Sequence, residues 1–580
     1  MELIKNELKQ VVENCKKRAR DHGLSFRDET LEFIVTNEDM IKLSPKGMIP
    51  TLYDYWIHDI YVLQDKGKYD LYPHNPYETV INTRPPLSFY NDNNPDWLNV
   101  MIFYHVIGHI DFFQNNVFFA KTWLDDFLGR AAANAQVIND LRQEHGRWVD
   151  YVIEFARGVD NLVNYYDHLA ETDEGTPCRT GSPLGAGIPG GSSRNSSGQT
   201  DRSQAKIDFF FDEYLQHINK VSTFKFIEEL ETLNQMRKNE GEENARNLFL
   251  VYIEKKYLDF THKFEKRPKK ALSKRQDVMQ YIMDHSPKLR KDDNDWMRQI
   301  MQVVRETSLY FQPQIRTKIL NEGWASYWHE VLFMDDPAMR THEFEWSRIN
   351  AGVVSLPRVG MNPYAIGLRM FKFLEAKADR GMMSYDFDKL TKTAERQDFD
   401  RKTGGGKDFI FKLRQYGCDA NAIREFIDQD FVNEFKLFVV GKRINQERQT
   451  WEYYVKSRKA EAYRKQMEDQ LYHPPHITVH RENTEKNGGL HLVHHFEGLE
   501  LVREYIHNTM LGIEFLWGNK VFLETHEIDE SQIEHANQEG PQQAKAPQTE
   551  EPEFRFQKVV YTMEDRKLTR QAFDQFITAR

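Results

Sequence analysis

Cysteine is scarce in this chain of 580 residues. The sequence has three cysteines, Cys15, Cys178 and Cys418, which lie far apart and form no CxxC pair. An odd number of widely spaced cysteines predicts neither a disulfide framework nor a zinc ribbon. This usage fits a reducing compartment, so we expect a cytoplasmic protein.

Long apolar runs and an excess of basic charge are lacking too. No stretch approaches the ~20 apolar residues that a membrane helix needs, and the N-terminal MELIKNELKQVVENCKKRAR has no apolar core of a secretory signal. The formal charge is −11, and the most basic stretches read as solvated helix faces. We therefore expect a soluble protein that binds neither membranes nor nucleic acid.

Hydrophobic and aromatic residues, at 40% and 13%, are plentiful enough for a large core. Most of the chain follows helical periodicity, so the predicted fold is mainly α, a multi-helix core. We assign residues 1–170 to its first part and 205–470 to its second. The Gly/Ser/Pro-rich residues 171–204 between them have the composition of a flexible insertion.

The period changes from helical to alternating near His473. HITVHRE, the turn NGG and LHLVHHF predict a hairpin, and a helix and the strand KVFLET follow. We assign residues 471–527 to a separate small α+β domain of ββαβ order. Residues 528–580 are predicted to form a polar linker and a final short helix.

Two histidines in YHVIGHIDFF are the first candidate for chemistry. His105 and His109 are spaced i and i+4, which places both imidazoles on one helix face within reach of a single metal ion. The spacing alone is a weak signal. The alternative interpretation is two core histidines satisfied by buried hydrogen bonds.

The segment NEGWASYWHE supplies the second half of a site. Glu322 opens an otherwise apolar and aromatic helix, where an unpaired carboxylate would be costly, so it calls for a cation. His329 lies about two turns further along the same face and would assist as a direct or outer partner. Two histidines on one helix and an NExxA glutamate on a later one are the ligands of a zincin-like site. We therefore predict a divalent metal, zinc, held by His105, His109 and Glu322.

One departure from that pattern matters. A zinc protease of this type has a glutamate after the first histidine as general base, and this chain has Val106. The catalytic candidates are therefore Glu78, a tentative base from HNPYETVIN, and His329. An exposed loop acid remains the alternative for Glu78. Asp111 points partly away from the ligand face and would instead hydrogen-bond a ligand histidine.

Two other sequence patterns give weaker evidence for a functional site. The GGG at 404–406 precedes Lys407 without the GxxxxGK[ST] spacing, so ATP binding is not predicted. The C-terminal unit is dense in histidine, for which a solvated sheet face is the better interpretation than a metal site. These histidines are His473, His476, His480, His491, His494 and His495.

Several long motifs occur together and in order: YETVIN, HVIGHIDFFQNNVFF, NEGWASYWHE, NPYAIGLRMF and NGGLHLVHHFEGLEL. In these the chain resembles the SpoVR (stage V sporulation protein R) family. The resemblance implies a role in spore cortex formation or in stress adaptation. It also implies two partners, a PrkA-type AAA+ serine-kinase-like protein and a von Willebrand A-like protein. It implies no particular reaction.

Two functions from different classes remain open. The first is a metal-dependent hydrolase of amide bonds at the predicted zinc site. The second is a non-catalytic scaffold or regulator working with the two partners, which the missing glutamate at Val106 favours. A di-iron site is disfavoured because the repeated Glu-x-x-His pairs of that class are absent.

Overall fold

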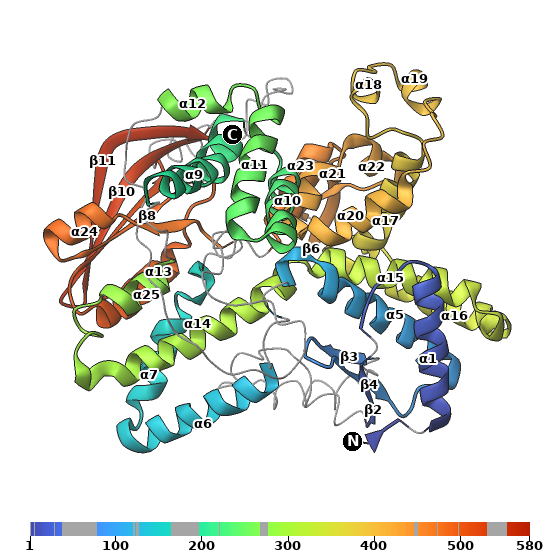
Figure 1. Cartoon of the computed structure of the whole chain (residues 1–580), viewed down its shortest axis with the longest axis horizontal. Helices are drawn as coiled ribbons and strands as arrows, with labels where there is room; N and C mark the ends of the chain where they lie inside the picture. Colours follow the sequence, from blue (N-terminus) through green and yellow to red (C-terminus); the bar gives the residue numbers. More distant parts are fainter. Residues whose placement is uncertain are drawn as a thin grey trace.

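The computed structural model describes residues 2–579, except for residues 5, 28, 37–77, 120–121, 123–126, 164–196, 220, 267–276, 446–449, 472–473, 497 and 530–553. The described chain is mainly helical, as predicted, with three small sheets (Figure 1). None of its described helices combines the length and the apolar character needed to cross a membrane.

A bundle of long helices forms the larger hydrophobic core. Its centre is α5 (Asp96–Asn115), in which every residue from 98 to 113 is buried. A helix that is apolar on all sides can be stable only inside a protein. The helices around it are α1 (Asn6–Asp21), α15 (Lys318–Asp335), α17 (Pro363–Asp379) and α20 (Gly406–Tyr416).

A four-stranded sheet of order β1-β2-β4-β3 precedes α5. Its strands are β1 (Glu2–Leu3), β2 (Leu31–Val35), β3 (Glu78–Ile81) and β4 (Leu87–Asn91). Strands β2 and β4 are parallel, whereas β3 runs antiparallel to β4. Strands β2 to β4 have only four or five residues each and lie among Pro, Gly and Asn residues, so the sequence gives little sign of them.

The remaining helices extend this core and surround a second one. They are α6 (Phe127–His145), α7 (Trp148–Arg157), α9 (Ser197–Phe209), α10 (Thr223–Glu240), α11 (Glu242–Lys256), α12 (Phe260–Lys266), α13 (Val278–His285), α14 (Asp295–Arg316), α16 (Glu343–Val353), α18 (Tyr385–Asp388), α19 (Thr393–Gln397), α21 (Asp419–Phe426), α22 (Gln429–Glu434) and α23 (Ala460–Glu468). Helix α9 begins inside the insertion predicted at 171–204. Residues 171–196 of that insertion lie outside the described residues.

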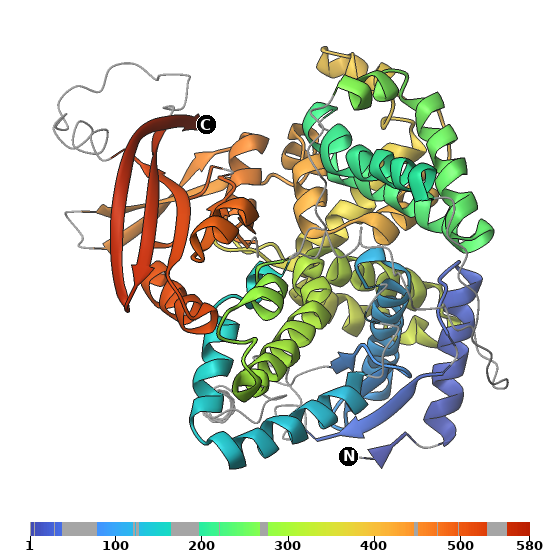
Figure 2. The ribbon, with the colours of Figure 1, turned by 60° about the vertical axis from the view of Figure 1, so that its left-hand side comes forward.

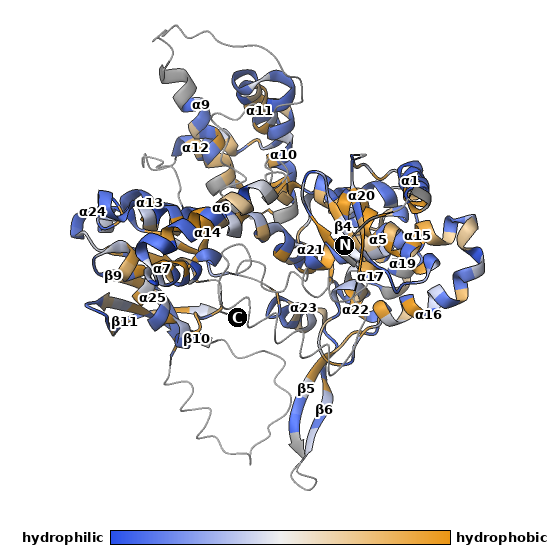
Figure 3. Ribbon diagram, turned by 90° about the horizontal axis from the view of Figure 1, so that it is seen from below, coloured by the Kyte–Doolittle hydropathy of each residue, from blue (hydrophilic) through white to orange (hydrophobic). Residues whose placement is uncertain are grey.

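A two-stranded hairpin separates α22 from α23. Its strands, β5 (Val439–Asn445) and β6 (Thr450–Ser457), are antiparallel and project from the helices (Figure 3). Figure 3 also shows that α5 and α15 are among the most hydrophobic elements of the chain.

The C-terminal unit is a five-stranded sheet of order β11-β10-β9-β8-β7. Its elements are β7 (Ile477–Val479), α24 (Arg481–Asn487), β8 (Leu490–His494), α25 (Arg503–Trp517), β9 (Val521–Ile528), β10 (Phe554–Glu564) and β11 (Lys567–Ala579). The predicted pairing of the first two strands is observed, since β7 and β8 are antiparallel, and the predicted helix α25 joins the parallel strands β8 and β9. The turn predicted between the first two strands is the short helix α24.

The predicted final helix is wrong, because residues 554–579 form the hairpin β10–β11. Val559, Tyr561 and Met563 are buried while the residues between them are not, which is the period of a strand. Asp565 and Arg566 have φ values of 51° and 62°. Two successive residues with positive φ suit the tight turn of a hairpin.

The C-terminal unit is not a separate domain, because it shares its core with helices from earlier in the chain. One hydrophobic cluster joins Leu492, Ile513 and Val559 of the unit to Val152 of α7 and Ile300 of α14. Figures 1 and 2 show this sheet beside α7, α13 and α14. The sequence suggested a boundary at 471 because the period changes there, but a change of period does not report which core an element joins.

Candidate metal centre

Small residues let three helices of the larger core pack closely. A Cβ atom on Gly108 of α5 would lie 2.8 Å from Ala325 Cα of α15. A Cβ atom on Gly323 of α15 would lie 2.4 Å from the backbone of Gly367 in α17. Only glycine permits these approaches. The backbones of α5, α15 and α17 are thereby held close enough for short side chains to meet.

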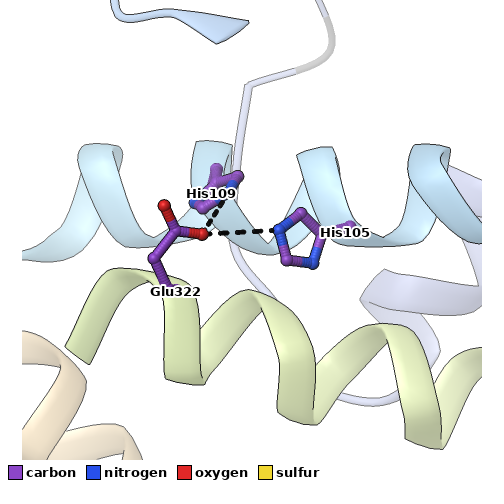
Figure 4. A group of neighbouring side chains, drawn as sticks. All are labelled: His105, His109 and Glu322. Carbon is purple, nitrogen blue, oxygen red and sulfur yellow. Dashed lines mark ion pairs between the residues drawn. The ribbon is translucent and has the colours of Figure 1, made fainter. Parts of the chain in front are cut away.

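His105, His109 and Glu322 converge at the α5–α15 contact (Figure 4). Glu322 Oε2 lies 3.6 Å from His105 Nε2 and 3.5 Å from His109 Nε2. Both histidines are buried, and the glutamate side chain is 16% exposed. The structure therefore brings together the three residues that the sequence predicts as metal ligands.

Hydrogen bonds at Nδ1, on the side of each ring away from Glu322, orient His105 and His109. His109 Nδ1 lies 2.9 Å from Asn321 Oδ1, and since an amide oxygen only accepts, Nδ1 donates the hydrogen. His329 Nε2 donates in the same way to Asn350 Oδ1 at 2.9 Å. Its Nδ1 is then an acceptor for His105 Nδ1, also at 2.9 Å. Both ligand imidazoles carry hydrogen on Nδ1, and their Nε2 atoms are the ones directed at Glu322.

The pKa values of His109, His329 and Glu322 favour the protonation states in which such groups bind a metal ion. Burial lowers the pKa of His109 to about 4, and it lowers the pKa of His329 to about 3. Burial alone would raise the pKa of Glu322, but His105, His109 and Tyr364 outweigh it and bring the pKa below its ordinary value. At neutral pH the imidazoles of His109 and His329 are therefore neutral and Glu322 is a carboxylate.

Tyr364 is a site residue that sequence reasoning missed. Its ring lies parallel to that of His105, with centroids 6.0 Å apart, and its hydrogen bond lowers the pKa of Glu322. Asn362 caps α17 by accepting hydrogen bonds from the backbone of Tyr364 and Ala365. The Asn-Pro pair at 362–363 is a helix-start signal, but it does not show where the first turn points.

The sequence predicts two acids in support of the site, Glu78 as a base and Asp111 as a partner of a ligand histidine. Glu78 is the first residue of β3, opposite Tyr90 in the register, and its side chain lies outside the described part of the structure, so its role remains a prediction. Asp111 is fully buried and accepts hydrogen bonds from the Ser25 backbone at 2.7 Å and from Trp324 Nε1 at 2.9 Å. It links α5 to α15, so we find no support for a bond from Asp111 to a ligand histidine.

Within the described ranges, His105, His109 and Glu322 are the one group of three or more His, Cys, Asp or Glu placed to share an ion. The described C-terminal histidines form no such group. His476 and His495 stack with their ring centroids 4.5 Å apart, His491 stacks on Phe522, and His494 Nδ1 lies 2.8 Å from Thr525 Oγ1.

A family model described as SpoVR like protein matches residues 2–474. This chain belongs to the SpoVR family. A curated relative, described as the uncharacterized protein YcgB of Escherichia coli (strain K12), is 24% identical over 437 residues, which cover 70% of this chain and 69% of the relative. No solved structure matches.

The family match covers both helices of the candidate site but ends before the C-terminal sheet. In this SpoVR protein, therefore, the His105, His109 and Glu322 cluster lies in the part of the chain that the family model matches. The C-terminal motif NGGLHLVHHFEGLEL lies beyond the matched residues.

Proposed function

We propose that this SpoVR protein binds a divalent metal ion, zinc by its donor set, and hydrolyses amide bonds with it. The observation that carries the proposal is the convergence of two Nε2 atoms and one carboxylate oxygen at a buried point. Glu322 Oε2 makes no hydrogen bond among the described residues, and 3.5 Å is too long for one with either imidazole.

A buried carboxylate oxygen without a partner is costly, and a cation removes that cost. Zinc binds nitrogen and oxygen at about 2.0–2.1 Å, so tetrahedral ligands lie roughly 3.3 Å apart. The observed separations of 3.5 and 3.6 Å need little adjustment to fit. Two histidines and a glutamate also match the zincin-like ligand set.

Three protein ligands leave one position open, where zinc would supply a polarised water with a pKa near 7. The chain's own groups would bind and orient the amide. The Tyr364 hydroxyl, which hydrogen-bonds Glu322, would donate to the carbonyl oxygen of an amide bound beside that glutamate. His329 holds His105 in the correct tautomer, and Glu78 is the candidate to take a proton from the water in place of the glutamate missing at Val106.

Metal content of the purified full-length protein tests this proposal. We expect one zinc ion per chain, lost in His105→Ala and in Glu322→Gln. His262→Ala, on α12 and outside the site, is the matched control and should keep its zinc. Unchanged metal in the two site variants would remove the proposal. With metal established, turnover of γ-glutamyl and peptidoglycan-type amides by the wild type but not by His105→Ala would establish the hydrolase.

A scaffold is the second candidate, favoured by Val106, which is 1% exposed where a general base would stand. In this alternative the protein acts in sporulation or stress adaptation by holding a PrkA-type AAA+ protein and a von Willebrand A-like protein. A stable complex with both that survives His105→Ala, together with no amide hydrolysis, would decide for it.

A further inference from the structure

A cavity of about 280 Å³ lies within the C-terminal unit, far along the chain from the metal ligands. Its walls come from the sheet strands β8 and β9, from α25 and from residues 158–162 after α7. These elements lie together on one side of the molecule in Figures 1 and 2. The proposed metal chemistry does not use this cavity.

The inner wall of the cavity is apolar. It is formed by Leu492, Leu523, Ile506, Met510 and Ile513, none of them more than 6% exposed. Water in a cavity needs several polar partners, and an apolar cavity of 150 Å³ stays dry and binds benzene. A larger cavity with such a wall favours an apolar guest over water.

The mouth of the cavity continues the apolar surface to the outside. Leu499, Val502 and Tyr505 line it and are 51%, 58% and 67% exposed. Polar groups also line the mouth, among them the half-buried Asn161 and the exposed His476. An apolar interior with a few polar groups at one end is the usual form of a small-molecule site.

We propose that this cavity binds the aliphatic chain of a small amphipathic molecule, whose uncharged polar head lies at the mouth near Asn161 and His476. Glu500 at the mouth and the net charge of −11 disfavour an anionic head. A partner helix is also disfavoured, since a helix with its side chains is about 10 Å across and the cavity holds only about 280 Å³.

A series of n-alkanols from hexanol to decanol, titrated into the full-length protein by calorimetry, tests the inference. Each buried methylene contributes about 0.8 kcal/mol, so the dissociation constant should fall about fourfold per added methylene until the chain fills the cavity. Affinity that does not change with chain length would overturn the proposal.

Cavity-filling variants locate the site. Leu492→Phe and Met510→Phe place a larger ring in the space, and each should weaken decanol binding at least tenfold while leaving the thermal midpoint nearly unchanged. Val493→Phe is the matched control, because neighbouring strand residues point to opposite faces of the sheet and Val493 does not line the cavity. It should bind decanol like the wild type. Equal binding by all three variants would show that the alkanol binds elsewhere.

Discussion

A substitution of Asn321 should show how much the orientation of His109, as distinct from its presence as a ligand, contributes to metal binding. Its amide oxygen accepts the Nδ1 hydrogen of His109 and so fixes that imidazole for the metal. Loss of such an outer partner weakens metal binding by about 10-fold to 100-fold. We expect that loss in Asn321→Ala, measured by competition for zinc with a chelator. Asn321→Asp keeps an acceptor at the same place and should restore the affinity; equal affinity in all three proteins would show that the hydrogen bond is incidental.

Asp419 gives the stability of the protein a pH dependence. Its carboxylate accepts hydrogen bonds from the backbone of Ile319 at 2.8 Å and of Leu320 at 3.0 Å, and so caps the helix that bears Glu322. Burial raises its pKa from 3.8 to about 7, although the two backbone donors oppose the rise. Between these values the folded protein binds a proton that the unfolded chain releases. The contribution of Asp419 therefore falls as pH rises from about 4 to about 7.

A comparison with Asp419→Asn tests this sign. The pKa difference corresponds to on the order of 4 kcal/mol across that interval. The free energy of unfolding of the wild type, measured by urea titration from pH 4.5 to pH 8, should include a term that declines toward pH 7. Asp419→Asn cannot titrate there and should lack that term, whatever its absolute stability. Parallel pH profiles for the two proteins would contradict the raised pKa.

At the residue scale, the sequence predicted the three candidate ligands but not the side chains that hydrogen-bond or pack against them. His105 and His109 are related by helical spacing, and Glu322 is conspicuous as an acid in an apolar helix. Asn350 and Tyr364 reach the site from α16 and α17. Their placement depends on how those helices pack, and no spacing within one segment encodes it.

At the scale of elements, the approach of α5 to α15 determines the geometry of the site. Gly108→Ala would place a methyl group 2.8 Å from Ala325 Cα, so the helices must separate. We expect a lower thermal midpoint and weaker zinc binding. Gly352→Ala is the matched control, because a Cβ atom there meets nothing within 4 Å. It should stabilise α16 by up to about 1 kcal/mol, since alanine favours helices. Normal zinc affinity in Gly108→Ala would show that the helix spacing is not critical.

Some helices and strands could be predicted from the sequence and others could not, depending on their length and composition. Most residues of helix α5 are apolar or aromatic, so its burial follows from composition. Strand β10 alternates buried with partly exposed residues, whereas β11 has no buried residue among its described positions. The polar segment before them favours a linker in the sequence and obscures the short alternation of β10. Strands β1 to β4 have at most five residues each. Strands so short carry too few positions for a period to be recognised.

At the scale of the whole molecule, α14 connects the two hydrophobic cores. Its first half contributes Met297, Ile300 and Val304 to the core shared with the C-terminal sheet. The chain then passes through Thr317 directly into α15, which carries Glu322. The helix is visible in Figure 1 between the two halves of the structure. Disorder in the C-terminal core should therefore reach the start of the metal-binding helix.

A chain ending at residue 529 tests this connection, because it removes β10 and β11 and with them Val559, Tyr561 and Met563. Each loss of a large core side chain costs about 2–5 kcal/mol, against a typical total stability of about 5–15 kcal/mol. We expect the shortened chain to bind a hydrophobic dye, to lose a cooperative thermal transition and to bind zinc more weakly. Met563→Ala should show a smaller loss in the same direction, and Thr562→Ala, on the other face of β10, almost none. An unchanged thermal midpoint and zinc affinity in the shortened chain would show that the C-terminal sheet is an independent unit after all.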